Sequence, residues 1–472
     1  MDIVIFQTGS PVGWISPEDL RGAAILALVF LSLLVIAELW RRLGNPKPEH
    51  TRKLVHLGGG VACLFFPFLV RSPWVVMALA LPLTGLFVLG AKLGFLKSLH
   101  GVGRRSRGAE YYPLAVFLVF VITQGRPWLY LSAVLVLAVA DAFAALIGSR
   151  YGVVRYEVEK ETKSLEGSLV FLVIAFLAIH LPTLLLTDLP RPVCVLAALL
   201  VAALVTGFEA VSLEGADNLF VPLAVVVILG KITSKPLSEV VFQNVSLLVI
   251  CLVVALMVWR VRSLNVGGTI AYVLFVYGTW SLGNWLWALP AFLGFAGYLG
   301  AWYQFAPPGH AAGVRVRTVT RALLPPFAML ALANGLGRYP DFYGPYLAAS
   351  AAVFAFALDT GVFRLEKVQG TSRIIAAPAL GILGTAFTAL APWIFQRTVP
   401  LTGLLAIAAV VVIVSLINAA IELRDPSDRP RDWTAWRFIL SLAAGLAVLG
   451  LQALGLIPEW DPRWMPRWPL TP

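Results

Sequence analysis

The chain has 472 residues, of which 59% are hydrophobic and 13% are charged, and its mean hydropathy is +0.85. These values exclude an ordinary soluble domain and predict an all-α, polytopic membrane protein. The net charge of +11 is explained by Lys and Arg in loops on one side of a membrane and by attraction to anionic lipid, so no nucleic-acid partner is expected.

Apolar runs long enough to cross a bilayer recur along the whole chain, and we expect a transmembrane helical bundle of about sixteen spans. The runs lie at 19–40, 54–70, 73–91, 113–123, 128–149, 168–187, 192–208, 218–230, 238–259, 266–282, 286–304, 322–337, 344–363, 374–395, 401–421 and 438–457. With the N-terminus outside, this order places 26 of the 36 Lys and Arg residues in inner loops. The sequence therefore predicts an integral, multi-pass protein with loop 150–163 in the cytoplasm, and no cleavable signal peptide is expected.

Two inner segments carry basic residues in patterns that suit phosphate groups. The second span begins with Arg52-Lys53-x-x-His56, ahead of three glycines, and helical spacing stacks the cations one turn from His56. The next inner loop, 97–113, is rich in glycine and arginine and includes Arg107, whose planar fork fits phosphate oxygens. Both segments predict phosphate contacts, and the alternative is ordinary positive-inside anchoring against lipid head groups.

The stretch from Ala140 to Ser168 carries the most informative pattern. Asp141 follows an apolar run, and a carboxylate at membrane depth usually marks a pathway, a counter-ion or a metal. The residues after it include those that a phosphate site needs: Gly148, Gly152, Lys163, Ser164, Glu166, Gly167 and Ser168. The pattern predicts a phosphate cradle with a metal-binding acid at its edge. The alternative is a tight helix crossing at small residues, with Asp141 paired to a neighbouring lysine.

The loop after the seventh span, 208–222, is acidic, although it lies on the inner side of the membrane, where loops usually carry Lys and Arg. It holds Glu209, Asp217 and Asn218 and no basic residue. Together with Asp141, these side chains offer the oxygen ligands that Mg²⁺ takes from one or two carboxylates plus substrate phosphates. An acidic loop that pairs with the arginines of 104–107 is the other interpretation.

Polar residues at 260–265 divide the chain into two modules, 1–260 and 261–472. In the second module, an acid at the inner end of a span again precedes a Gly-Thr-Ser segment, and this order indicates a distant internal repeat. The candidate site residues of this module are Asn334, Asp359, Thr360, Gly370, Thr371 and Ser372.

The first module resembles the phytol kinase and dolichol kinase family over about residues 50–235. The motifs that carry this resemblance are Arg52-Lys53-x-x-His56, Arg107-Gly108-Ala109-Glu110, Asp141-x-x-Ala144-x-x-x-Gly148-x-x-x-Gly152, Lys163-Ser164-x-Glu166-Gly167-Ser168, and Glu209 with Asp217-Asn218-Leu219. Members are CTP-dependent membrane kinases of isoprenoid alcohols, so the resemblance implies a CTP site formed by the stretch from Asp141 to Gly167. For such a reaction we expect Mg²⁺ on Asp141 and Asp217, the phosphates near Lys163, Arg52 and Arg107, and Glu209 or His56 as the acceptor of the alcohol's proton.

The second module resembles the phytyl-phosphate kinase family of membrane proteins. The residues that carry this likeness are Leu264-Asn265-x-Gly267, Arg321, Ala333-Asn334-Gly335, Asp359-Thr360 and Gly370-Thr371-Ser372. This likeness implies a second phosphorylation, from monophosphate to diphosphate, and an inactive structural half is the alternative. Two other functions remain open for the chain: a CTP-using cytidylyltransferase, and a lipid or ion transporter in which Asp141 couples an ion.

Overall fold

The computed structural model describes residues 15–44, 46, 48–93, 107–159, 161–261, 264–305, 314–364, 371–396, 400–424 and 433–460. Gly370 and most of the basic loop 97–113 therefore lie outside the described residues. The chain packs as two compact units that meet in sequence at Asn244 and Val245. This division falls within a helix, α12, whereas the sequence prediction places the boundary between modules at the end of that helix.

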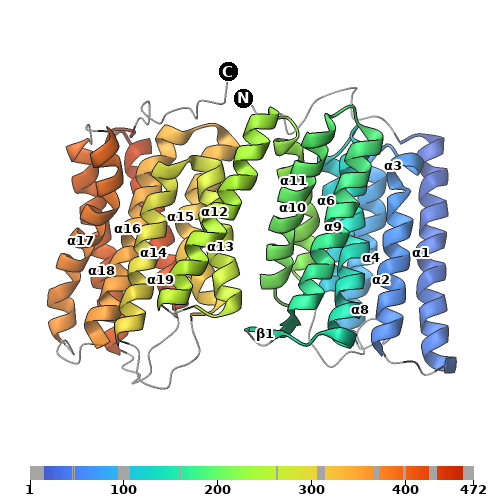
Figure 1. Cartoon of the computed structure of the whole chain (residues 1–472), viewed down its shortest axis with the longest axis horizontal. Coiled ribbons are helices and arrows are strands. Elements are labelled where there is room, and N and C mark those ends of the chain that lie inside the picture. Colours follow the sequence, from blue (N-terminus) through green and yellow to red (C-terminus); the bar gives the residue numbers. More distant parts are fainter. Residues whose placement is uncertain are drawn as a thin grey trace. The chain divides into compact units, whose positions relative to one another are not determined.

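The first unit is a helical bundle with one short hairpin (Figure 1). Its elements are α1 (Pro17–Gly44), α2 (Pro48–Leu64), α3 (Phe66–Leu69), α4 (Pro73–Leu93), α6 (Gly108–Ile122), α7 (Pro127–Leu135), the π-helical turn η1 (Val136–Ala140), α8 (Asp141–Tyr151), β1 (Arg155–Val158), β2 (Glu161–Ser164), α9 (Leu165–Leu186), α10 (Arg191–Val211), α11 (Asp217–Ile232) and α12 (Leu237–Val261). The hairpin replaces the polar linker that the sequence suggests, and it pairs Tyr156 with Lys163 in antiparallel register.

The second unit is helical throughout its described residues. It consists of α13 (Val266–Gly283), α14 (Trp285–Phe305), α15 (Val316–Leu336), α16 (Tyr339–Arg364), α17 (Thr371–Gln396), α18 (Leu401–Arg424) and α19 (Ala435–Ala453). α16 is the central helix, because it packs against α14, α15, α17, α18 and α19. Aromatic residues fill the core beside it, with Trp287, Tyr343 and Tyr346 fully buried.

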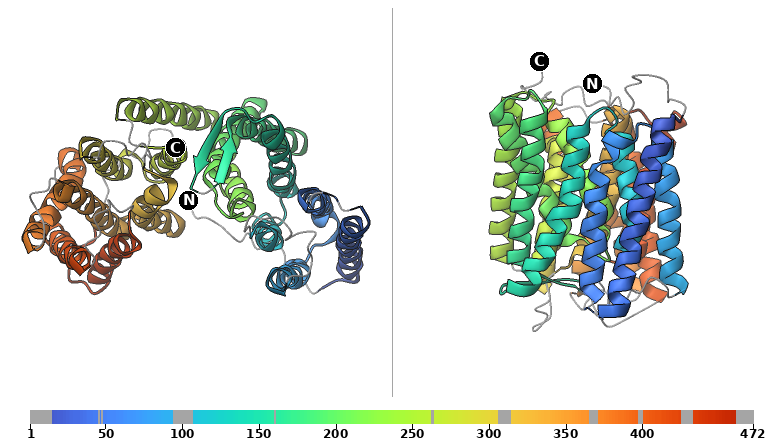
Figure 2. Two further views of the ribbon diagram at one scale, coloured as in Figure 1. Left: turned by 90° about the horizontal axis from the view of Figure 1, so that it is seen from below. Right: turned by 90° about the vertical axis from the view of Figure 1, so that its right-hand side faces the viewer.

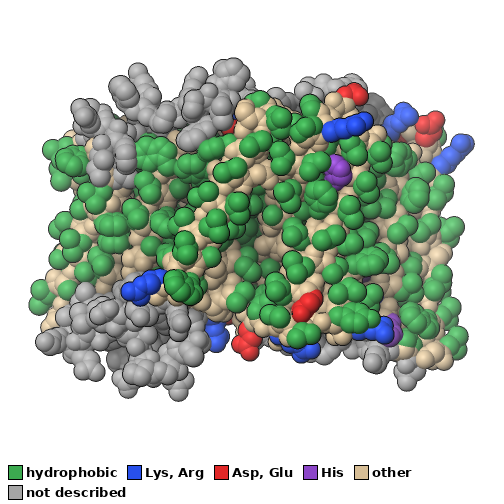
Figure 3. Space-filling model, in the orientation of Figure 1, with side chains coloured by type: hydrophobic (Ala, Val, Ile, Leu, Met, Phe, Trp, Pro, Cys, Tyr) green, Lys and Arg blue, Asp and Glu red, His purple; other side chains and the backbone are tan. Residues whose placement is uncertain are grey.

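Twelve helices of the described residues are long and apolar enough to cross a membrane, so the multi-pass, all-α prediction is confirmed. The count of about sixteen spans is not confirmed. Four expected spans fall on the shorter or less apolar helices α2, α6, α11 and α14. Hydrophobic side chains cover the faces of the helices visible in Figure 3, and charged side chains gather near their ends, as lipid contact requires.

One local irregularity positions the carboxylate that the sequence singles out. α7, η1 and α8 follow one another without a break, and Asp141 is the first residue after the π-helical turn. Single π-helical turns inside α-helices often occur at functional sites, because the extra residue redirects the side chains that follow. The turn therefore sets the direction in which Asp141 faces.

Candidate active site

The first unit contains a cavity of about 1680 Å³. An ordinary small-molecule pocket has about 300–1,000 Å³, so this cavity has room for two ligands. Its lining includes most of the candidate residues of the first module: Arg52, His56, Arg107, Asp141, Gly148, Lys163, Ser164, Gly167, Ser168, Glu209, Asp217 and Asn218. Lys53, Gly152 and Glu166 do not line it.

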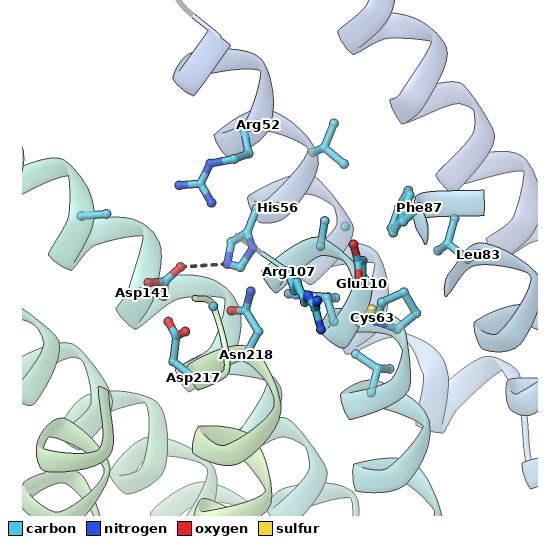
Figure 4. Close-up of a pocket in the computed structure, with 18 of the residues that line it drawn as sticks. Arg52, His56, Cys63, Leu83, Phe87, Arg107, Glu110, Asp141, Asp217 and Asn218 are labelled. Carbon is cyan, nitrogen blue, oxygen red and sulfur yellow. Dashed lines mark ion pairs between the residues drawn. The ribbon is translucent and has the colours of Figure 1, made fainter. Parts of the chain in front are cut away.

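His56 of α2 and Asp141 of α8 face each other across the polar part of the cavity (Figure 4). The Nε2 atom of His56 lies 3.4 Å from a carboxylate oxygen of Asp141 and 3.2 Å from the carbonyl oxygen of Leu137. Both neighbours are acceptors, so Nε2 carries the proton and Nδ1 is the free base. Asp141 therefore pairs with a histidine, and not with the neighbouring lysine that the tight-crossing interpretation of the sequence expected.

Lys163 makes its strongest contacts with Glu209, near the end of α10. Its Nζ lies 2.8 Å from the Glu209 carboxylate and also donates to the Glu209 backbone carbonyl. Burial alone lowers the pKa of Lys163, but the carboxylates of Glu209 and Asp217 outweigh it, and the net pKa lies above the usual 10.5. Lys163 is therefore a fixed cation on the cavity wall, and Glu209 is held as its counter-ion rather than left free to accept a proton.

The glycines serve the close crossing of α8 and α9. A Cβ atom on Gly148 would lie 2.9 Å from the Ser164 hydroxyl, and one on Gly152 would lie 2.7 Å from the Ser164 Cβ atom, just before α9. Ser164 caps α9 by accepting a hydrogen bond from the Gly167 N–H at 3.1 Å. The tight-crossing interpretation is thus confirmed for Gly148 and Gly152. The crossing also brings the N-terminus of α9 to the cavity wall, where its positive end suits an anion.

Two predicted phosphate contacts have other partners. Oε1 of Glu166 accepts hydrogen bonds from the N–H groups of Val153 and Val154, at 3.0 and 3.1 Å, so this carboxylate fixes the turn before β1. A carboxylate in that place would also repel a phosphate. The hydroxyl of Ser168 lies 2.8 Å from that of Tyr156, which holds β1 against α9 while Ser168 still borders the cavity.

The acidic turn completes the polar wall. Asp217 and Asn218 begin α11 and face the same space as Asp141 and His56 (Figure 4). The turn is fixed to α6 by a 2.9 Å hydrogen bond from the Arg107 N–H to the carbonyl oxygen of Glu214. This backbone contact is the only part of the proposed pairing with arginines 104–107 that falls on described residues, since 104–106 lie outside them.

The donor set fits Mg²⁺ only in combination with a substrate. Among the described residues, no group of three or more His, Cys, Asp and Glu side chains could hold a metal ion. Asp141 and Asp217 supply two carboxylates, and Mg²⁺ commonly takes one or two carboxylates and completes its shell with water and phosphate oxygens. The site therefore suits a metal that arrives with a nucleotide.

Two polar side chains of α6 border the site in addition to the predicted site residues. The hydroxyl of Tyr112 is buried and has no hydrogen-bond partner among the described residues, and its ring stands edge-on to His56 at 5.0 Å between centroids. Glu110 lines the same cavity. Glu110 stands in the motif that begins at Arg107 and Tyr112 follows it by two residues, but a short helix start gives no indication of which side chains face inward.

Asn334 lies apart from the other candidate residues of the second unit, whereas Asp359 pairs with Arg373, the neighbour of Ser372 at the start of α17. Asn334 hydrogen-bonds to Tyr339 at the start of α16, whereas Asp359 lies about 30 Å further along that helix at its rise of 1.5 Å per residue. A void found in this unit, beside Tyr272 and Phe327, has about 10 Å³, room for one water molecule at most. The role of these positions therefore stays a prediction.

Asp359 is part of a buried ion cluster instead. It pairs with Arg373 and with Arg437, the latter at 2.9 Å, and Asn418 donates to it at 3.1 Å. Glu422 lies 3.6 Å from Arg437, and Thr360 accepts a hydrogen bond from Arg437 at 2.6 Å. The predicted role of Asp359 and Thr360 in phosphate chemistry therefore gives way to a structural one, with both carboxylate oxygens already occupied.

We expect Asp359→Asn to destabilise the second unit by about 3–5 kcal/mol. The substitution removes the main counter-ion of two buried guanidinium groups, those of Arg373 and Arg437, and leaves them only the more distant carboxylate of Glu422. Asp341→Asn, on the same helix, is the matched control: its partner Arg338 is 66% exposed, so the loss should be about 0–1 kcal/mol. Thermal unfolding in detergent compares the two variants. A variant of Asp359 that loses product but keeps its stability would return this residue to a catalytic role.

The chain is similar to a phytol kinase from Synechocystis sp., with 36% identity over 201 residues. The match covers 42% of this chain and 86% of that relative. No family model matches the chain, and no solved structure matches it. The similarity to the relative thus involves less than half of the chain.

Proposed function

The chain belongs to the phytol kinase family, and we propose from this premise that its first unit transfers the terminal phosphoryl group of CTP to the hydroxyl of a membrane isoprenoid alcohol. The observation that carries the proposal is a single cavity with a polar wall at one end and an apolar wall at the other. A lipid kinase needs this combination, because its nucleotide is highly charged and its acceptor is dissolved in the bilayer. CTP as donor is the expectation from the family resemblance.

Phosphoryl transfer asks the protein mainly for positioning and for neutralisation of charge. Lys163, Arg52 and Arg107 line the cavity and supply positive charge for the nucleotide phosphates. Asp141 and Asp217 would hold Mg²⁺, which when bound neutralises the phosphate oxygens and orients them for attack.

His56 is the proposed acceptor of the alcohol's proton. Its Nε2–H is oriented by Asp141 and by the Leu137 carbonyl, which leaves Nδ1 as the basic nitrogen. Glu209, the other candidate from the sequence, is engaged by Lys163. A base whose second nitrogen is fixed by a carboxylate is a recurring catalytic arrangement, since the carboxylate stabilises the charged form.

The proposal places the reaction at the cytoplasmic face of the membrane. The polar wall of the cavity includes β2, which belongs to a segment that the distribution of Lys and Arg assigns to the inner side. Nucleotides are available there, and the alcohol can reach the same depth from the bilayer.

The test is an assay with purified protein, phytol and CTP labelled in the terminal phosphate, with ATP in a parallel reaction. We expect labelled lipid monophosphate and release of CDP, with little product from ATP. Release of pyrophosphate would instead indicate a cytidylyltransferase, and absence of any phosphorylated lipid would contradict the kinase. Labelled lipid diphosphate would be the sign of the second phosphorylation that the resemblance assigns to the C-terminal half.

A further inference from the structure

The segment 150–155, which joins α8 to β1, presents apolar side chains at the surface of the first unit. Tyr151, Val153 and Val154 are 57%, 84% and 54% exposed, which puts Val153 among the most exposed hydrophobic residues of the described chain. The hairpin that follows lies at one end of the helices of this unit (Figure 1), and an end-on view shows both of its strands in front of them (Figure 2, left). The proposed reaction assigns no role to these three side chains.

The segment lies at the depth where the hydrocarbon of a bilayer ends. The carbonyl oxygen of Val154 accepts a 2.9 Å hydrogen bond from the N–H of Leu165, the first residue of α9. α9 has 22 residues, about 33 Å at a rise of 1.5 Å per residue, which is close to the hydrocarbon thickness of about 30 Å. Leu165 therefore lies at a boundary between hydrocarbon and head groups, and Val154 lies beside it.

The exposed face of α9 continues into this segment. Leu165, Leu169 and Val173 recur at every fourth position, and each is about half exposed. Apolar side chains exposed on a helix that spans the membrane face lipid. Because Val154 is hydrogen-bonded to Leu165, the segment extends this lipid-facing surface past the end of the helix.

The backbone of the segment is fixed with its apolar side chains outward. Oε1 of Glu166 accepts hydrogen bonds from the N–H groups of both Val153 and Val154, and the side chain of Arg155 donates to the Gly152 carbonyl oxygen at 3.4 Å. Folding the two valines back onto the protein would break these bonds. Apolar surface held in this way is stabilised when an apolar medium covers it.

Charge is sorted along the same hairpin. Arg150 and Arg155 are exposed and flank the apolar side chains, and the Arg150 guanidinium lies 5.4 Å from the centroid of the Tyr151 ring. The part of the hairpin further along the chain carries three acids instead, Glu157, Glu159 and Glu161. An anionic lipid surface attracts the first part and repels the second.

We propose that the segment 150–155 is a docking surface for anionic phospholipids, in the leaflet at this end of the first unit. Val153, Val154 and the Tyr151 ring enter the boundary between head groups and hydrocarbon, where aromatic side chains are enriched. The two arginines contact the lipid phosphates, and their stems lie along the apolar surface. The hairpin also carries Lys163, so docked lipid steadies the polar wall of the cavity. The docking itself does not depend on the proposed kinase function.

Photocrosslinking of the full chain in lipid nanodiscs tests this surface. The protein carries p-benzoylphenylalanine in place of Val153, and the nanodiscs hold equal amounts of radiolabelled phosphatidylglycerol and phosphatidylcholine. We expect phosphatidylglycerol to be attached at least about fivefold more than phosphatidylcholine, since one arginine near an anionic surface favours anionic lipid by about that factor. The same probe in place of Glu157, exposed on the acidic part of the hairpin, is the control and should attach little lipid.

A second variant tests the charge. Arg150→Gln should lower the preference for phosphatidylglycerol about fivefold while position 153 still attaches lipid. Arg191→Gln is its matched control, because Arg191 is also exposed but begins α10 at the opposite end of the helices, and it should leave the preference unchanged.

Three results would overturn the docking surface. They are as little lipid at position 153 as at 157, attachment of position 153 to another protein chain in place of lipid, and equal attachment of the two phospholipids. Because the readout needs no turnover, it is separate from the kinase assay. If the wild type phosphorylates no alcohol, the kinase proposal fails, and the attached lipid still decides whether the segment docks on the membrane surface.

Discussion

Asp141→Asn should lower the rate of lipid phosphorylation by about 10³-fold, the largest effect expected of a single change in this chain. The substitution keeps the size of the side chain but removes a charge from the pair with Asp217 that is proposed to hold Mg²⁺, and from the partner of His56. The proposed metal site and the orientation of the proposed proton acceptor should both be disturbed at once. The initial rate with labelled CTP and phytol measures the loss.

Matched variants separate this effect from general damage. Asp188→Asn, in the connection between α9 and α10 and outside the cavity lining, should leave the rate unchanged. Asp217→Asn should resemble Asp141→Asn, and the double variant should be little worse than either, because residues that act as a unit give non-additive losses. Stabilisation of the protein by Mg²⁺ and nucleotide, read as a shift in unfolding temperature, should disappear in both single variants. Normal turnover in Asp141→Asn would remove the metal site.

The polar residues of the first unit could be predicted because each breaks a rule of membrane sequences. Asp141 stands out as a carboxylate in an apolar run, and Asp217 as part of an acidic loop on a positive side. Those violations are visible without knowledge of the fold. The structure adds that both side chains face the same cavity, which no spacing along the chain could establish.

Partners could not be predicted, because pairing depends on how distant helices cross. His56 and Asp141, or Lys163 and Glu209, are brought together by packing of helices whose order in space the sequence leaves open. Glu166 has the composition of a site residue but its carboxylate serves a local turn. The partners of Asp359 in the second unit could not be predicted either. The order of residues after Asp359 resembles the order after Asp141, but the structure surrounds Asp359 with Arg373 and Arg437, whereas Asp141 borders the cavity.

The apolar lining of the cavity could not be predicted, for a different reason. Phe66, Gly59 and Phe87 are ordinary members of hydrophobic runs, and in a membrane protein such residues face lipid, neighbouring helices or a ligand with the same sequence pattern. Only the arrangement of α1 to α4, α6 and α8 shows which apolar faces are turned toward the cavity. Polar residues therefore predict where a site is to be sought, and the apolar lining of the cavity is found from the structure.

Lys163→Met should lower the rate by about 10²-fold and weaken nucleotide binding, since it removes a buried cation from the phosphate side of the cavity. It should also lower stability, because Glu209 is then a buried carboxylate without its counter-ion. The raised pKa of Lys163 keeps it protonated throughout the neutral range, so a fall in rate between about pH 7 and 9 would have another origin.

The double variant Lys163→Met, Glu209→Gln distinguishes the two roles of this lysine. Neutralising both partners removes the unpaired charge, so the unfolding temperature should recover toward that of the wild type. The rate should stay low, because the cation that Lys163 would place beside the phosphates is still missing. Recovery of the rate together with stability would mean that Lys163 acts only as the partner of Glu209, and the phosphate contacts would then have to come from Arg52 and Arg107 alone.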